Sequence, residues 1–173
     1  MKKSIWMLGL VSVLLITFGI NVQAQPKEVT ESGITTYYVT SKLLPLEEGG
    51  LYMSYEGIGA TVNDTGQGLF HNATVRALGG MKIEKGIYKD ERGWGVFNLQ
   101  NGDKVFFTYR YSGEVDPTGV GIAKGTVTFT GGTGKCAGIQ GTFDATRYTP
   151  RSAPALQGAG LSYNKATVKY KLP

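Results

Sequence analysis

A glycine-rich segment that contains a lysine, TFTGGTGKCAGIQGTF at residues 128–143, is the first candidate for chemistry. A phosphate-binding loop of the Walker type requires G-x-x-x-x-G-K-[ST], whose last hydroxyl ligates magnesium. Here Phe129 stands where the first glycine is needed, and Cys136 follows Lys135 in place of serine or threonine. The G-x-G-x-x-G pattern of dinucleotide sites also fails, because its third glycine would come one residue late. We therefore interpret the segment as a structural corner between two strands.

The single histidine and one glutamate are the candidates for acid–base catalysis. His71 alternates with Ala73 and Val75, and an imidazole that faces inward could exchange protons near neutral pH. Glu56 alternates with Tyr52 and Ser54, and inside an apolar cavity it could act as an acid or a base. Each has a simpler interpretation, which we favour: a histidine bound to water or backbone, and a solvated outward carboxylate.

Six aromatic residues are candidates for the wall of a ligand-binding cavity. Small-molecule pockets are mostly apolar with a few polar groups. The same side chains could equally fill the interior of a small barrel. The candidates are Tyr37, Tyr55, Trp94, Phe107, Tyr109 and Tyr111. The sequence leaves open whether the interior is open or filled.

Metal and cofactor chemistry is not indicated by the composition. His71 is the only histidine and Cys136 the only cysteine, so sites built from several of these residues are excluded. One cysteine also excludes an internal disulfide. With one histidine and no G-x-S-x-G elbow, no serine-hydrolase triad can be assembled. We expect no metal and no cofactor.

The elements that must position these residues are β-strands. Val105, Phe107, Tyr109 and Tyr111 share one face of residues 104–112, while polar residues occupy the other. Such alternation is typical of antiparallel strands with one buried face. Asn101-Gly102 between two alternating runs predicts a hairpin. Eight or nine strands are expected, within residues 33–44, 50–62, 68–79, 80–91, 94–113, 119–131, 141–149 and 158–172.

The predicted fold is all-β, a single antiparallel eight-stranded barrel of a calycin-like kind. No stretch after the N-terminal region has a convincing helical period. Glycine contributes 26 of 173 residues, and it recurs inside strands, as in RGWGV and GVGIAKG. Glycine weakens a strand but permits the sharp coiling that barrel closure needs. This favours a closed barrel over a sandwich.

Residues 1–24 have the layout of a secretory signal peptide. Lys2 and Lys3 precede an apolar run, and Val22-Gln23-Ala24 supplies small residues before a cleavage site. The barrel domain is then expected at residues 25–173, secreted or periplasmic in a bacterium, with no membrane anchor after cleavage. The excess of 18 basic over 13 acidic residues is too mild to indicate a nucleic-acid partner.

The corner FTGGTGKCAGIQGTFDA, residues 129–145, resembles the glycine motif of the allene oxide cyclase and dirigent barrel superfamily. The matching glycines are Gly131, Gly132, Gly134, Gly138 and Gly141. The resemblance implies a motif that joins two antiparallel strands of an eight-stranded barrel, with a central side chain tucked under the wall. Cys136 stands where an aromatic residue is usual. No catalytic residues of that family can be transferred to this chain.

Three functions are compatible with these features. The first is an exported barrel that binds a small hydrophobic ligand without catalysis. The second, implied by the resemblance, is a cyclase or isomerase acting on a hydrophobic substrate by confinement and a weak acid–base group. The third is a structural secreted protein with a filled barrel, which assembles into homo-oligomers. An inward polar group in an open cavity would favour the enzyme, and the absence of any cavity would favour the third.

Overall fold

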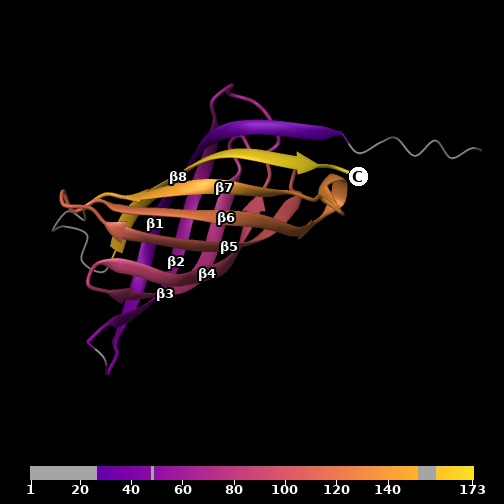
Figure 1. Ribbon diagram of the computed structural model, residues 1–173. Coiled ribbons are helices and arrows are strands. Elements are labelled where there is room, and N and C mark those ends of the chain that lie inside the picture. The colour runs from indigo at the N-terminus through magenta and orange to yellow at the C-terminus, as the bar shows by residue number, and fades with distance from the viewer. Residues whose placement is uncertain (1–26, 48, 152–158) are drawn as a thin grey trace, which may run out of the picture.

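The computed structural model describes residues 27–47, 49–151 and 159–173, which form a closed antiparallel barrel of eight strands in chain order (Figure 1). The strands are β1 (Glu28–Pro45), β2 (Leu51–Asn63), β3 (Thr74–Glu84), β4 (Ile87–Asn98), β5 (Lys104–Val115), β6 (Gly121–Gly132), β7 (Thr142–Thr149) and β8 (Ala159–Lys171). β8 pairs with β1 and closes the barrel. The predicted all-β eight-stranded barrel is thereby confirmed. The predicted signal peptide lies outside the described residues.

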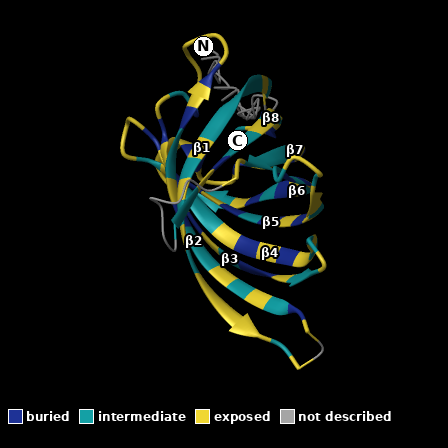
Figure 2. Ribbon diagram, turned by 90° about the vertical axis from the view of Figure 1, so that its left-hand side faces the viewer, coloured by how far each residue is buried: buried dark blue, intermediate teal, exposed yellow. Residues whose placement is uncertain are grey.

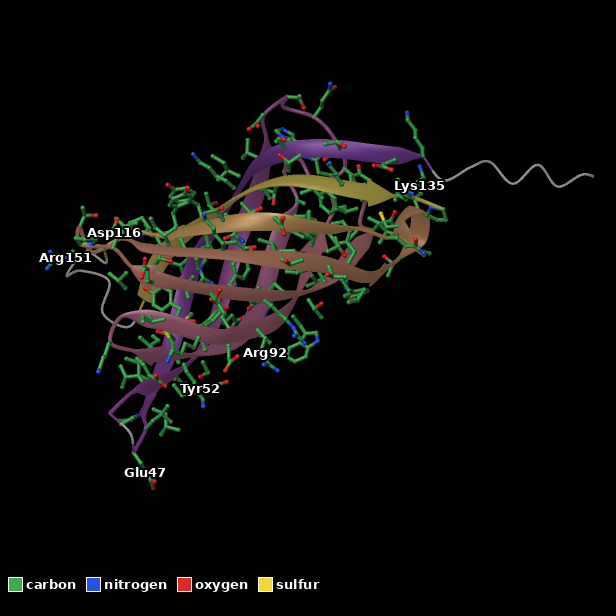
Figure 3. All side chains as sticks on the ribbon, viewed as in Figure 1. Glu47, Tyr52, Arg92, Asp116, Lys135 and Arg151 are labelled. Atoms are coloured by element: carbon green, nitrogen blue, oxygen red, sulfur yellow. The ribbon has the colours of Figure 1, made fainter. Side chains whose placement is uncertain are left out.

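The hairpins alternate between the two ends of the barrel. Asp116 and Arg151 lie at one end, and Lys135 lies at the other (Figure 3).

Throughout the described part of the chain, no helix is long and apolar enough to cross a membrane.

Two strand boundaries differ from the sequence prediction. The third and fourth strands were expected to meet at Gly79-Gly80, but they meet at Lys85-Gly86. Both turn residues have positive φ, 50° and 80°, as a tight primed hairpin turn requires. Residues 68–73 are turns rather than the start of a strand, so the alternation expected through His71 does not exist there. The predicted Asn101-Gly102 hairpin joins β4 to β5.

The barrel interior holds the core, and buried residues alternate with more exposed ones along the strands (Figure 2). On β5, Val105, Phe107, Tyr109 and Tyr111 are buried, as the alternation predicted. Their neighbours on β6, including Val127 and Phe129, also face inward. The regular parts of these strands therefore follow the period of two that the sequence shows.

Several inward glycines make room for aromatic rings from the neighbouring strand. A Cβ built on Gly95 would overlap the ring of Phe107, its register partner on β5. A Cβ on Gly93 would overlap the hydroxyl of Tyr109, and one on Gly125 would contact the Tyr111 ring closely. Because the interior of an eight-stranded barrel is narrow, large side chains fit only beside small ones. The glycines thus admit the tyrosines that define the interior.

The segment between β6 and β7 is the structural corner expected from the glycine pattern. A short 3-10 helix, Gly134–Cys136, follows β6. Cys136 is fully buried and belongs to the hydrophobic core. No helix follows the segment, and Asp103 accepts a hydrogen bond from the Lys135 backbone N–H. The nucleotide-loop interpretation is excluded on geometry as well as on sequence.

Phe70 fills the barrel at the end where this corner lies. Its ring packs against Phe97, Phe129 and Tyr170 with centroid separations of 5.1–5.5 Å. Glu31 on β1 holds the segment that carries Phe70, because its carboxylate accepts hydrogen bonds from the backbone N–H groups of Leu69 and Phe70. The aromatic ring and its carboxylate clamp form a plug at this end.

Candidate functional site

The barrel encloses a cavity of about 420 Å³. This volume falls within the roughly 300–1,000 Å³ range of small-molecule sites. Five of the six aromatic candidates line it: Tyr37, Tyr55, Phe107, Tyr109 and Tyr111. Met53, Met81 and Ile83 line it farther from the Phe70 plug. The interior is therefore mainly apolar, with tyrosine hydroxyls as part of its polar surface.

Trp94 does not line the cavity. Its side chain is 67% exposed on the outer wall of β4. Gly93 and Gly95 occupy the inward positions on either side of it, so the pleat of the strand points the indole outward. The expectation that Trp94 lines the cavity is therefore wrong.

Glu56 and His71 also lie away from the cavity. Glu56 is on the outer face of β2, where its Oε1 lies 2.5 Å from Nε of Arg76 in an exposed ion pair. His71 sits in the turn between β2 and β3, and its Nδ1 accepts a 3.3 Å hydrogen bond from the backbone N–H of Asn63. Both placements match the simpler interpretations, and neither side chain lines the cavity.

A bulge in β4 brings an unexpected carboxylate into the barrel. The pairing of β4 with β5 shifts between Tyr88 and Glu91, and Asp90 has a φ of 50°. An extra residue in one strand re-aims the side chains that follow it. As a result Glu91 is fully buried, with 1% of its surface exposed.

Arg147 on β7 neutralises this carboxylate. Its Nη1 pairs with Oε1 of Glu91, and its Nη2 donates to Oε2 at 2.6 Å. The Arg147 side chain is 11% exposed and the Glu91 side chain 0%. A two-pronged pair of this kind satisfies both charges where water is scarce. Arg147 lines the cavity, whereas Glu91 lies behind it.

A chain of tyrosine hydroxyls leads from the cavity wall to the ion pair. Tyr109 donates to the hydroxyl of Tyr55 at 2.9 Å, and Tyr55 in turn donates to Oε1 of Glu91. Both oxygens of Glu91 are thus occupied by protein groups. The carboxylate is positioned to orient the tyrosines and the arginine rather than to contact a molecule in the cavity.

Tyr111 and Asn164 form the opposite flank of the cluster. The Arg147 guanidinium lies 5.3 Å from the centre of the Tyr111 ring, and Nδ2 of Asn164 donates to the Tyr111 hydroxyl at 3.2 Å. Oδ1 of Asn164 is buried and has no hydrogen-bond partner; among the described residues it is the one buried side-chain polar atom in this condition. A buried acceptor without a partner costs free energy.

Burial fixes the protonation states of the cluster. It raises the pKa of Tyr55 and Tyr111 far above the usual range, with the charge of Glu91 adding to the shift for both. Burial raises the pKa of Tyr109 to about 12. Burial alone would lower the pKa of Arg147, but the charge and hydrogen bonds of Glu91 outweigh it and raise that pKa. The tyrosines stay neutral and the arginine stays charged at physiological pH.

The sequence interpretation missed Glu91, Arg147 and Asn164. Arg147 carries a readable signal, because it alternates with Phe143 and Ala145 on the inward face of β7. Asn164 likewise alternates with Ser162 and Ala166 on β8. Glu91 carries none, because the bulge that turns it inward breaks the period of two.

Among residues 27–47, 49–151 and 159–173, no group of three or more His, Cys, Asp or Glu side chains is arranged to hold a metal ion. Comparison of the chain with protein-family models, with curated proteins and with solved structures finds no match.

Proposed function

We propose that this protein binds one small, mainly hydrophobic molecule inside the barrel and does not transform it. The observation that carries the proposal is the cavity of about 420 Å³, which is lined by aromatic and aliphatic side chains around a few fixed polar groups. Apolar walls supply affinity through burial, and the polar groups orient the guest. The presence of this cavity is inconsistent with a completely filled barrel, which a purely structural role would require.

The position and the hydrogen-bond partners of the Glu91 carboxylate support binding over catalysis. An acid–base catalyst must reach the proton that it moves. Glu91 does not line the cavity, and Arg147 and Tyr55 occupy its oxygens. The buried tyrosines hold their protons, because burial raises their pKa.

A cyclase or isomerase is the second candidate. The hydrogen-bonded chain from Tyr109 through Tyr55 to Glu91 favours it, because the chain connects the cavity surface to a carboxylate. The resemblance of residues 129–145 to the allene oxide cyclase and dirigent barrels points in the same direction. In either case we propose an exported protein, consistent with the signal-like residues 1–24.

Native mass spectrometry of residues 25–173, purified gently from the host, tests the proposal. We expect one small guest per chain, and an empty chain should take up an apolar fluorescent probe with a stoichiometry of one. Recovery of the guest unchanged after incubation supports binding, whereas conversion to an isomer supports the second candidate. A chain that carries no guest and takes up no probe would refute both.

Two variants locate the binding. Ala166→Phe places a ring in the cavity from β8 and should abolish probe uptake. Trp94→Phe changes an outer-wall residue and should leave uptake unchanged. Unfolding curves of both variants show whether a loss of uptake is a loss of fold.

A further inference from the structure

The side chain of Tyr37 identifies a class of ligand for the cavity. This inference rests on the proposed binding function and specifies the ligand. Alternate residues of β1 from Gly33 to Ser41 line the cavity, and Tyr37 is the middle one of them. Its ring lies against Gly57 on β2, another residue of the lining. Tyr37 therefore belongs to the interior of the barrel and not to its rim.

The Tyr37 hydroxyl has no protein partner but is accessible. Four other tyrosine hydroxyls take part in hydrogen bonds, those of Tyr55, Tyr109, Tyr111 and Tyr170. The hydroxyl of Tyr37 forms none with any residue of the described ranges. Within those ranges, Oδ1 of Asn164 is the one fully buried polar side-chain atom without a partner. The Tyr37 oxygen consequently retains accessible surface, and on a residue that lines the cavity this surface faces the cavity.

The groups around this hydroxyl present a positive field to the cavity. Burial raises the pKa of Tyr37, and the neighbouring Tyr111 and Tyr109 raise it further. The charge of Arg147 acts in the opposite direction. Because such effects weaken with distance, these groups lie near the Tyr37 oxygen. Arg147 lines the cavity and Glu91 lies behind it, so the positive end of the ion pair is the end nearer to a ligand.

Unused donors outnumber accessible acceptors at this place. Arg147 gives two N–H groups to Glu91 and keeps its others. The Tyr111 oxygen accepts a hydrogen bond from Asn164, and its own proton has no acceptor among the described residues. Both Glu91 oxygens are occupied, and Oδ1 of Asn164 is fully buried. A ligand that supplies an acceptor therefore matches the wall better than one that supplies a donor.

The charge balance favours an uncharged acceptor over a carboxylate. A buried carboxylate loses several kcal/mol or more of hydration, which an unpaired positive charge would have to offset. The charge of Arg147 is already balanced by Glu91, and a ligand carboxylate beside the guanidinium would also lie close to the Glu91 carboxylate. A neutral carbonyl oxygen carries partial negative charge without either penalty.

We propose that the ligand is an uncharged, mainly apolar molecule with a carbonyl group, whose oxygen accepts a hydrogen bond from the Tyr37 hydroxyl on the Arg147 side of the cavity. Ketones, aldehydes and esters belong to this class. The apolar remainder of the ligand lies along Phe107 and the methionines Met53 and Met81.

Three matched compounds test this class: acetylnaphthalene, isopropenylnaphthalene and naphthoate, substituted at the same ring position. The first two have the same shape and differ in a carbonyl oxygen against a methylene group, and the third is an anion. Displacement of an apolar fluorescent probe at neutral pH measures their affinities. We expect the ketone to bind at least as tightly as the hydrocarbon, although it gives up more hydration, and naphthoate to bind most weakly.

Tyr37→Phe tests the assigned donor. It removes the hydroxyl and keeps the ring, so the affinity for acetylnaphthalene should fall about tenfold, as expected for one hydrogen bond. The affinity for isopropenylnaphthalene should not fall. Tyr38→Phe is the matched control, because Tyr38 is the next residue of β1 and lies exposed on the outer wall. It should leave both affinities unchanged.

The infrared carbonyl band of bound acetylnaphthalene reports the hydrogen bond independently of affinity. The band should lie at lower wavenumber in the wild type and in Tyr38→Phe than in Tyr37→Phe, because donation to the oxygen weakens the carbonyl bond. A band that Tyr37→Phe leaves in place would overturn the assignment of Tyr37, whatever the affinities.

The outcomes separate this inference from the proposed function. If neither the apolar probe nor any of the three compounds binds to the wild-type protein, the binding function itself fails. If naphthoate binds best, or if the ketone binds with an affinity that does not respond to Tyr37→Phe, binding stands and the carbonyl ligand is overturned.

Discussion

The carboxylate of Glu91 on β4 and the guanidinium of Arg147 on β7 meet inside the barrel, although β5 and β6 separate their strands in the sheet. This pair links two parts of the wall across the lumen. It also anchors Tyr55 and, through it, Tyr109. The polar surface that a guest would meet is therefore organised by a carboxylate that the guest does not touch.

Removal of one member of the pair should destabilise the protein more than removal of both. Glu91→Leu leaves a buried guanidinium without its counter-charge, at a cost of about 3–5 kcal/mol. Adding Arg147→Met removes that charge, and the double variant should lose only about 1–2 kcal/mol, mainly because the Tyr55 hydroxyl loses its acceptor. Urea denaturation of Glu91→Leu, of Arg147→Met and of the double variant measures the coupling, and purely additive losses would contradict it.

Alkaline pH should destabilise the folded barrel through its buried tyrosines. Burial raises the pKa of Tyr109 from 10.0 to about 12, and it raises the pKa of Tyr55 and Tyr111 further. Unfolded tyrosines lose their protons first as the pH rises. The contribution of these groups is therefore complete below about pH 10 and declines above it, by up to about 1.4 kcal/mol per pH unit for each tyrosine.

Urea midpoints from pH 9 to pH 12, together with tyrosinate absorbance, measure this loss. The buried tyrosines should ionise only as the far-ultraviolet circular dichroism signal disappears. Tyr109→Phe should make the decline shallower, because it removes one of the delayed groups. Complete tyrosinate formation in a barrel that is still folded would contradict the burial of the cluster.

The success of the sequence prediction depended on the regularity of each strand. On β5 nothing interrupts the alternation of apolar and polar residues. The inward-facing residues from Val105 to Tyr111, and the barrel fold itself, could therefore be predicted directly from the sequence. On β4 the bulge at Asp90 shifts the period, and the buried Glu91 could not be recognised. The strand that was expected to start at residue 68 and to carry His71 does not start there, because residues 68–73 turn before β3 begins.

Trp94 illustrates a different difficulty. The residues in RGWGV alternate as in any strand, but here the inward positions hold glycine and the outward one holds tryptophan. A rule that places large apolar residues inside gives the wrong face. The inward glycines are explained by the rings of Tyr109 and Phe107, which arrive from β5 and leave no room for a side chain. Such cross-strand fit requires the register, which the sequence alone did not supply.

Gly95→Ala should be destabilising, and a smaller partner should relieve it. The atoms nearest to a Cβ built on Gly95 all belong to the Phe107 ring, and the Cβ would overlap them. Overpacking of this kind costs about 1–3 kcal/mol. Phe107→Leu should therefore cost less in the Gly95→Ala background than in the wild type, where it only leaves a cavity. Thermal or urea unfolding of the two single variants and the double variant measures the difference, and equal costs in both backgrounds would contradict the proposed fit.

Glu31 should control the plug formed by Phe70 at one end of the barrel. Its carboxylate accepts hydrogen bonds from the Tyr170 hydroxyl at 2.5 Å and from Nδ2 of Asn63 at 2.6 Å, besides the two backbone N–H groups of the plug. Glu31→Ala should cost about 2–4 kcal/mol, since bonds to a charged acceptor are strong. Hydrogen exchange at Leu69 and Phe70 should accelerate more than exchange on β5.

Glu31→Gln is the matched control for this effect. It preserves the size of the side chain and one acceptor oxygen, so the acceleration should be smaller than in Glu31→Ala. Unchanged exchange at both plug residues in the alanine variant would show that packing of Phe70 alone holds the segment.

Cys136 should react slowly with thiol reagents as long as the barrel is folded. Its side chain is fully buried in the corner between β6 and β7, and burial, with a smaller contribution from Asp103, raises the pKa of its thiol. The thiolate is the reactive form, so both access and ionisation are unfavourable. We expect labelling by an aromatic disulfide reagent to be on the order of a hundredfold slower in the native protein than in urea. Rapid labelling without denaturant, or a disulfide-linked dimer after mild oxidation, would show that the corner opens readily and that this thiol is available to a second chain.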